Sequence, residues 1–128
     1  MFNACYGYSS VSAYEVKQTN SRYSSNEGVL YSKDGSVLIA IPLQYMGVLT
    51  VPEGVKVWAE EALCRDIDYF KDIAINKITE IRIPSTIEEI PEKQLEAVNL
   101  LADTYGTKIT VSESNPWFTV SENHLVVK

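Results

Sequence analysis

Positive charge is scarce in this sequence, and the shortage disfavours one class of partner. The 128 residues contain 11 Lys and Arg against 17 Asp and Glu, which gives a formal net charge of −6 at pH 7. Proteins that bind nucleic acid depend on clustered Lys and Arg to neutralise phosphates. We therefore expect no nucleic-acid partner, and we interpret the negative charge as an aid to solubility.

Residues suited to catalysis or metal binding are also few. The sequence has two cysteines, Cys5 and Cys64, and one histidine, His124. The cysteines allow at most one disulfide and match no metal-binding spacing, and a buried free thiol is the simpler interpretation of Cys64. The carboxylates between Asp66 and Asp72 lack the glycine and the distal glutamate of a calcium loop. Without a nucleophile elbow or a phosphate loop, we expect no enzyme activity, no cofactor and no metal.

Long apolar runs are absent as well. No stretch approaches the roughly 18 apolar residues of a membrane-spanning helix, so we expect no membrane insertion. The N-terminal residues MFNACYGYSSVSAYEVK have neither the basic nor the apolar region of a secretion signal. These features favour a cytoplasmic or particle-associated protein over a classically secreted one.

The length suffices for one domain with a continuous core, and we divide the chain into a lead-in at 1–13 and a domain at 14–128. The clearest local pattern is Asp34-Gly35 between two β-rich runs, which predicts a hairpin turn. Apolar residues at three- and four-residue steps predict a helix from about Trp58 to Ile75. A second helix is expected from about Pro91 to Tyr105, and further strands at Ile109 to Val111 and His124 to Val127.

Two internal self-matches organise the sequence. Val51 to Leu63 aligns with Ile83 to Leu95 without a gap, at an offset of 83 − 51 = 32 residues. Tyr14 to Lys33 aligns with Ile109 to Lys128, at an offset of 109 − 14 = 95 residues. Such repetition is typical of units that bury their apolar faces by stacking, with strands of successive units side by side in parallel. In the second match the chain ends at the counterpart of the first hairpin strand, without a return strand.

The repeated pattern I-x-I-P-x-x-[VI]-x-x-[IW]-x-x-x-x-L occurs at 49–63 and 81–95, and it resembles the BspA-type leucine-rich repeats of bacterial surface proteins. The sequence departs from that family where Ala-Phe is usual, at Ala62-Leu63 and Gln94-Leu95. The resemblance implies an α/β fold. It would be a short leucine-rich-repeat solenoid with a parallel strand ladder, two helices on the convex side and a β-hairpin near the N-terminus.

The outer face of the predicted ladder is the first candidate binding surface, because leucine-rich-repeat proteins most often bind partners there. It is either a mixed-charge contact patch or an ordinary solvated face. Two tyrosines outside the repeats are candidates for either contact or core. The candidate partner-binding residues are Glu15, Thr50, Glu80, Arg82, Lys108, Thr110, Tyr6 and Tyr8.

These patterns favour a non-catalytic protein–protein interaction module, and the resemblance implies recognition or adhesion. Its partner would be another protein or further copies of itself. The alternative is a structural subunit of a larger assembly, such as a virion or other particle. Such a subunit would be joined through exposed strand edges and the aromatic N-terminus.

Overall fold

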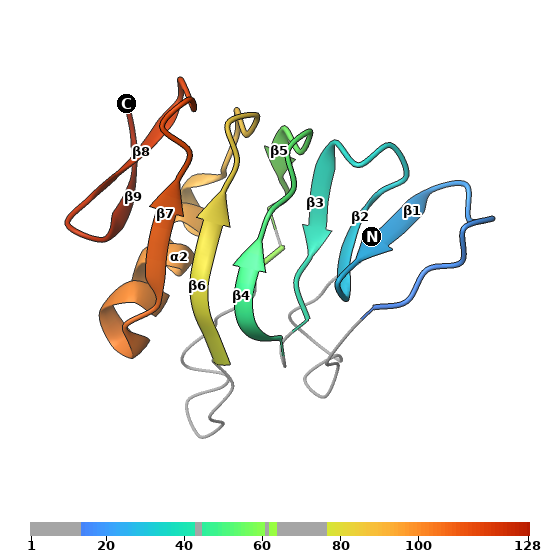
Figure 1. Ribbon diagram of the computed structural model, residues 1–128, viewed down its shortest axis with the longest axis horizontal. Helices are drawn as coiled ribbons and strands as arrows, with labels where there is room; N and C mark the ends of the chain where they lie inside the picture. Colours follow the sequence, from blue (N-terminus) through green and yellow to red (C-terminus); the bar gives the residue numbers. More distant parts are fainter. Residues whose placement is uncertain (1–13, 43–44, 61, 64–76) are drawn as a thin grey trace.

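The structure of the protein is a computed structural model that describes residues 14–42, 45–60, 62–63 and 77–128. The strands follow one another along the long axis, with the N-terminal strands at one end and the C-terminal hairpin at the other (Figure 1). The elements are β1 (Tyr23–Asn26), β2 (Val29–Ser32), β3 (Val37–Ala40), β4 (Met46–Thr50), β5 (Val57–Trp58), β6 (Lys77–Ile83), α2 (Glu92–Tyr105), β7 (Lys108–Val111), β8 (Phe118–Ser121) and β9 (His124–Val127).

Strands β4, β6 and β7 form a parallel sheet with β6 in the centre. Leu49 pairs with Ile81, and Ile81 pairs with Ile109. All three side chains are buried, because alternate residues of a strand point to opposite faces of the sheet. The apolar alternation of these strands therefore builds one wall of the core.

The repeat at an offset of 32 residues is confirmed by direct contacts between equivalent positions. Val51 and Ile83 are both buried, and the Val51 N–H donates to the Arg82 carbonyl at 3.1 Å. In the turns that follow, the Glu53 carboxylate accepts hydrogen bonds from the backbone N–H and the hydroxyl of Ser85, at 3.1 and 2.7 Å. Stacked turns thus continue the alignment that the parallel strands begin.

Strands β1, β2, β3 and β5 form a second sheet, in that order. β2 and β3 are antiparallel, and Gly35 lies between them with a φ of 77°. The Asp34 Oδ1 atom accepts from the Ser32 hydroxyl and from both the N–H and the hydroxyl of Ser36. The hairpin predicted from Asp34-Gly35 is confirmed.

The β1–β2 and β8–β9 hairpins have the same architecture. Four residue pairs join the strands of each hairpin across a two-residue turn, with partners that correspond under the 95-residue offset. Both turn residues have positive φ in both hairpins: Glu27 and Gly28 in the first, Glu122 and Asn123 in the second. The second self-match therefore corresponds to a repeated structure, in which β8 is the equivalent of β1 and β9 the equivalent of β2.

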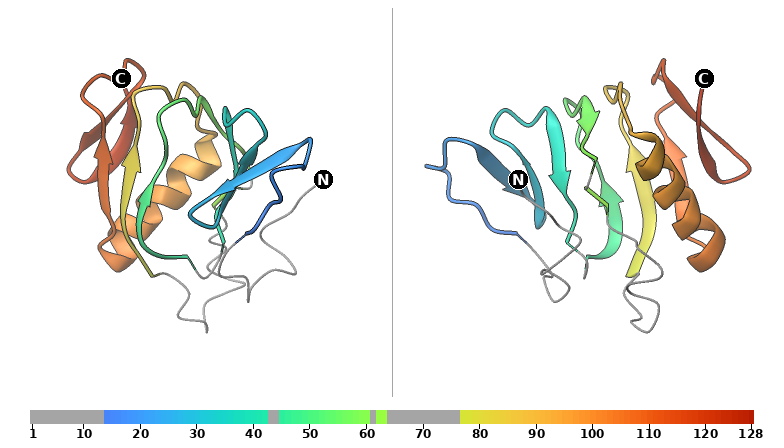
Figure 2. Two further views of the ribbon diagram at one scale, coloured as in Figure 1. Left: turned by 45° about the vertical axis from the view of Figure 1, so that its right-hand side comes forward. Right: turned by 180° about the vertical axis from the view of Figure 1, so that it is seen from behind.

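Helix α2 lies behind the parallel sheet (Figure 2) and agrees with the predicted helix. It ends at Gly106, which adopts the left-handed conformation at a φ of 74°. Val98, Leu101 and Ala102 are buried, whereas Tyr105 at the end of the helix is 47% exposed. In the part of the chain that the structure describes, no helix has the length and apolar character required to cross a membrane.

Helix α2 also covers one edge of the C-terminal hairpin. The Asn99 carboxamide donates to the Leu125 carbonyl at 3.0 Å and accepts from the Leu125 N–H at 2.7 Å. Leu125 corresponds to Leu30, which pairs with Ala40 of β3 in the first hairpin. The Asn99 side chain therefore occupies, at Leu125, the side of the hairpin where β3 adds a third strand to the equivalent β2.

The predicted fold class is wrong. Within the described ranges, the strands form three separate sheets of four, three and two strands, and there is one helix rather than two. The predicted helix from Trp58 begins instead with strand β5, because Trp58 donates its N–H to the Glu89 carbonyl and Val57 pairs with Val37. Its continuation through 61 and 64–76 lies outside the described residues.

A continuous solenoid does not form, because the parallel pairing that runs from β3 through β5 to Glu89 is short and interrupted. β5 has two residues, and its link to the next repeat is a single bridge between Val57 and Glu89. The repeats predicted the parallel pairing of β4, β6 and β7 but not how far that pairing extends. The result, in the described part of the chain, is a β-rich fold of three small sheets with one helix packed behind the parallel sheet.

Candidate functional site

The outer face of the β4–β6–β7 sheet presents two rows of side chains that cross all three strands. Pairing in the sheet aligns Thr50 with Arg82 and Thr110, and it aligns Val48 with Glu80 and Lys108. Thr50, Arg82 and Lys108 are exposed, while Glu80 and Thr110 are partly buried. The alternation predicted from the sequence is confirmed, since these residues flank the buried Leu49–Ile81–Ile109 row.

Glu80 and Arg82 form the polar centre of this face. Arg82 Nε donates to Glu80 Oε2 at 2.8 Å, and Thr110 Oγ1 lies 3.4 Å from the same oxygen. The Arg82 hydrogen bond, followed by the charges of Arg82 and Lys108, holds the pKa of Glu80 below its ordinary value. The Arg82 side chain remains 55% exposed and that of Glu80 17%, so the guanidinium is positioned by its neighbour and still open to solvent.

A shallow hollow of about 360 Å³ lies where the three strands end. Its walls are the Thr50–Arg82–Thr110 row and the turns that begin at Pro52 and Pro84. The Glu53–Ser85 hydrogen bonds hold two of these turns together and keep the pKa of Glu53 below its ordinary value. The hollow therefore has two hydrogen-bonded turns on one side and one exposed cation, Arg82, among its described lining residues.

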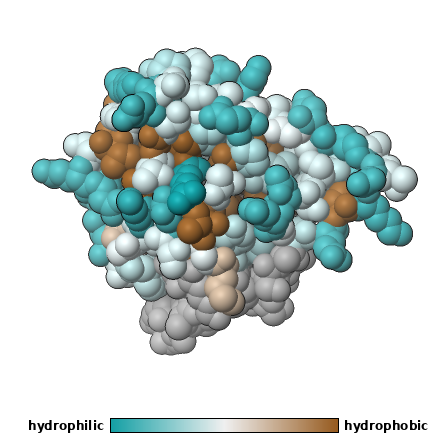
Figure 3. All heavy atoms as spheres, in the orientation of Figure 1, coloured by the Kyte–Doolittle hydropathy of each residue, from teal (hydrophilic) through white to brown (hydrophobic). Residues whose placement is uncertain are grey.

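Apolar side chains adjoin the polar rows at the start of β4. Met46 is 68% exposed and Val48 is 39% exposed. Figure 3 shows this face as a mixture of hydrophilic and hydrophobic atoms, without one dominant character. Such a mixture, with an arginine at its centre, is typical of protein-binding surfaces.

The structure brings together five of the eight predicted binding residues and separates the others. Glu15 is exposed but belongs to none of the three sheets; its neighbour Tyr14 donates its N–H to the Gly28 carbonyl. Tyr6 and Tyr8 lie outside the described residues. The five residues that share the outer face are Thr50, Glu80, Arg82, Lys108 and Thr110.

Sequence reasoning missed Met46, which precedes the repeated pattern at 49–63. The available signal was Gly47, which has a φ of 92° and lies at an irregularity in the pairing with β6. A glycine inside a strand often marks such a bulge. Strand β4 begins at Met46, before this irregularity, and Met46 is the most exposed large apolar residue among those described.

Among residues 14–42, 45–60, 62–63 and 77–128, no cluster of three or more His, Cys, Asp or Glu side chains is placed to hold a metal ion. His124 Nε2 lies 2.7 Å from Asp103 Oδ1, an exposed contact between β9 and α2. Cys5 and Cys64 lie outside the described residues. The outer face of the β4–β6–β7 sheet therefore remains the candidate binding site.

No protein-family model matches the sequence, and no curated protein matches it. Among solved structures, it is similar to a leucine-rich repeat protein from Eubacterium ventriosum ATCC 27560, with 22% sequence identity and a TM-score of 0.42. The match covers 62% of this chain and 25% of that chain, so the present chain spans a quarter of the length of that protein. That protein is identified only as a leucine-rich repeat protein, so the similarity does not test the resemblance to the BspA type.

Proposed function

We propose that this chain is a non-catalytic module that binds another protein through the outer face of the β4–β6–β7 sheet. The observation that supports the proposal most directly is the pair of aligned rows that cross the three strands. A parallel sheet backed by a buried core holds these side chains at set spacings, so little order has to be imposed when a partner binds. The sequence resemblance to BspA-type repeats supports recognition or adhesion as the biological setting.

Arg82 is the residue on which we expect the interaction to depend most. It is exposed, its position is held by Glu80, and it borders both the hollow and the polar row. Arginine is enriched among the few residues that dominate binding energy at interfaces. Lys108 and Thr110 extend the same surface onto β7.

The proposal is tested by comparing the wild-type protein with Arg82→Glu in affinity capture from an extract of the source cells. Lys93→Glu is the matched control, because Lys93 is exposed on α2 and the charge change is identical. A specific partner should be retained by wild type and by Lys93→Glu, and lost or weakened at least tenfold by Arg82→Glu. Equal capture by all three proteins would place the binding surface elsewhere.

A second candidate is a structural subunit joined to others through strand edges. Among the described residues, β9 pairs with β8 alone, whereas the equivalent β2 pairs on both sides. This open side favours the candidate, but the Asn99 carboxamide already occupies it at Leu125. Assembly through β9 would therefore require either displacement of Asn99 or pairing beyond it.

A further inference from the structure

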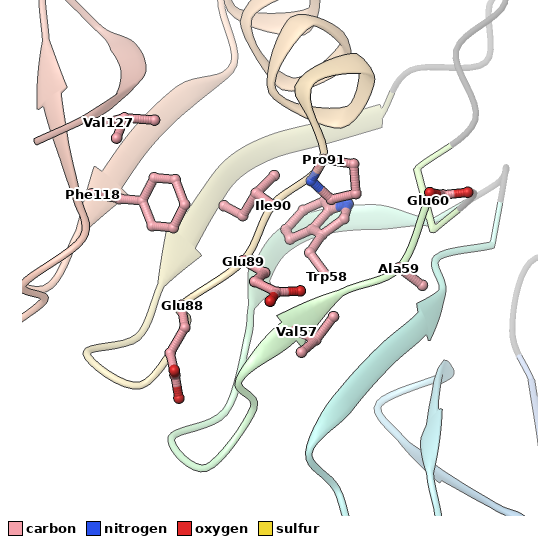
Figure 4. Close-up of a pocket in the computed structure, with 10 residues that line it drawn as sticks. All are labelled: Val57, Trp58, Ala59, Glu60, Glu88, Glu89, Ile90, Pro91, Phe118 and Val127. Carbon is pink, nitrogen blue, oxygen red and sulfur yellow. The ribbon is translucent and has the colours of Figure 1, made fainter.

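A second concave surface lies on the other side of the core from the outer face of the sheet. It is a groove of about 530 Å³ between the β8–β9 hairpin and the segment that leads into α2. Figure 4 shows the Phe118 ring and the Ile90 side chain directed toward one another, with Val127 above Phe118 and the Glu89 carboxylate below Ile90, while the carboxylate of Glu88, which also lines the groove, points away from these apolar side chains. We propose that this groove binds a short extended segment of a partner protein in which an apolar side chain is flanked by Lys or Arg.

The floor of the groove is apolar and closely packed. Phe118, Ile90 and Trp58 line it and are buried, whereas Val127 is 65% exposed at its edge. The Trp58 indole N–H donates to the Gln94 side chain at 2.7 Å, so the ring is held in one orientation. An apolar side chain placed against Val127 and Phe118 would remove exposed hydrocarbon from water without any rearrangement of this floor.

The charged residues that line the groove have one sign. Glu60, Glu88 and Glu89 are exposed and acidic, and no Lys or Arg is found among the described residues of the lining. A second copy of this chain carries a net charge of −6 and would bring like charges together. Charge complementarity therefore selects a basic partner segment rather than self-association.

The backbone of β9 is the third feature of the groove that supports the proposal. In an antiparallel pair, alternate residues direct both their N–H and C=O groups away from the partner strand. Leu125 directs both groups at Asn99, so Val127, two residues later, directs its own groups to the same side, at the border of the groove. Strand β3 shows that this side of the equivalent hairpin accepts an extended segment.

Nuclear magnetic resonance titration of the isotope-labelled protein tests the proposal. The probe is acetyl-Lys-Val-Lys-Val-Lys-amide, and the comparison peptide has Glu in place of each Lys. We expect saturable shifts at the Val127 and Glu89 amides and at the Trp58 indole N–H with the basic peptide alone. N-methylation of the central valines should weaken binding, because it removes the backbone pairing.

Protein variants distinguish binding in this groove from binding at the outer face of the sheet. Glu88→Gln combined with Glu89→Gln should lower the affinity for the basic peptide at least fivefold. Val127→Ala should lower this affinity as well. Glu96→Gln combined with Glu113→Gln is the matched control: both residues are exposed, neither lines the groove and the charge change is the same. Arg82→Glu, which tests the sheet face, should leave the affinity for the peptide within twofold.

Four outcomes overturn the proposal: no saturable shifts, equal binding of the acidic peptide, shifts centred outside the groove, or equal weakening by the control pair. Peptide-independent dimerisation that covers Val127 would also overturn it, in favour of a second copy as the occupant. None of these results bears on the sheet face, whose test is the capture experiment with Arg82→Glu.

Discussion

Gln94 and Asn115 are buried amides whose polar atoms all have partners. Gln94 accepts from the Trp58 indole and the Leu63 N–H, and its amide group donates to the carbonyls of Glu60 and Leu63. Asn115 likewise makes four hydrogen bonds, two in each direction. Satisfied amides of this kind cost little to bury and specify which segments meet, because any other arrangement leaves polar groups unpaired.

Replacement of Asn115 by Asp should therefore destabilise the folded protein strongly. Aspartate can accept from the following N–H groups but cannot donate to the carbonyls of Pro84 and Ile87, and it adds a buried charge. We expect a loss of about 2–4 kcal/mol in the free energy of unfolding, measured by urea denaturation.

Asn20→Asp is the matched control for this change. Asn20 corresponds to Asn115 under the 95-residue offset and accepts from the N–H groups of Arg22 and Tyr23, but it is exposed. We expect a change below about 0.5 kcal/mol there, since aspartate accepts the same bonds in water. Similar losses at both positions would mean that burial of Asn115 is not what makes it important.

The turn residue Asp34 predicts a measurable dependence of stability on pH. The Ser36 N–H, the Ser36 hydroxyl and the Ser32 hydroxyl donate to its carboxylate and lower the pKa of Asp34 to about 2. Because the folded pKa is depressed, the stabilisation is complete above the unfolded value of about 4 and is lost as the pH falls toward about 2.

Asp34→Asn keeps an acceptor oxygen and removes the charge, so it isolates this effect. The variant should have a lower melting temperature than wild type at pH 6, and the difference should shrink between about pH 4 and 2. Circular dichroism melts of both proteins across this range measure it. A difference that stays constant down to pH 2 would show that the charge of Asp34 contributes nothing.

At the scale of elements, the contact between α2 and β9 decides how the hairpin is protected. The edge of a strand exposes backbone groups that can pair with another chain. The Asn99 carboxamide satisfies one such pair of groups, at Leu125, in place of a third strand. A side chain that imitates a backbone thus limits the length of edge that is available to a partner.

Asn99→Ala should expose that edge. We expect a loss of about 1–3 kcal/mol in stability, since the buried Leu125 backbone loses two partners, and an increased tendency to self-associate. Sedimentation velocity over a range of concentrations measures the association. Glu96→Ala, at an exposed position of the same helix, should remain like wild type. If Asn99→Ala stays monomeric throughout, the edge is protected by something other than this side chain.

At the scale of the whole molecule, one core cluster joins both ends. It includes Val29 of β2, the sheet residues Leu49 and Ile81, Val98 of α2 and Leu125 of β9. If either end unfolded alone, apolar side chains in the middle of the molecule would lose packing partners and be exposed to water.

The protein should therefore unfold in one cooperative transition. Trp58 reports the core and Trp117 the C-terminal hairpin, and Trp117→Phe leaves Trp58 as the single tryptophan. The fluorescence midpoint of that variant should coincide with its far-ultraviolet circular dichroism midpoint in urea. Separate midpoints would show that the hairpin or the N-terminal sheet melts independently.

Local features were predictable where one short stretch determines its own backbone. Asp34-Gly35 specifies a tight turn, and Gly106 ends a helix whose apolar period is clear from Leu95 onward. The outer face of β4, β6 and β7 was predictable for a related reason, since alternation sends Thr50, Arg82 and Thr110 to one side once the strands align.

Features that depend on partners distant in the chain were not predictable. The apolar spacing after Trp58 suggested a helix, but the partners Val37 and Glu89 draw Val57 and Trp58 into an extended conformation. Gln94 was noticed only as a departure from the usual repeat, and its role depends on four groups from 58–63. The groove beside Val127 forms between segments about 30 residues apart in the chain, so no local sequence pattern predicts it.

By itself, the sequence determined the turn at Asp34-Gly35, the helix α2, the repeated units and the side of β4, β6 and β7 that faces the core. These follow from backbone preferences and from the period of apolar residues, which act over a few residues at a time. Only the tertiary structure decided that three small sheets replace one continuous ladder, and that an asparagine on a helix closes the edge of β9. Those outcomes depend on which distant segments complete each other's hydrogen bonds and cover each other's apolar surface.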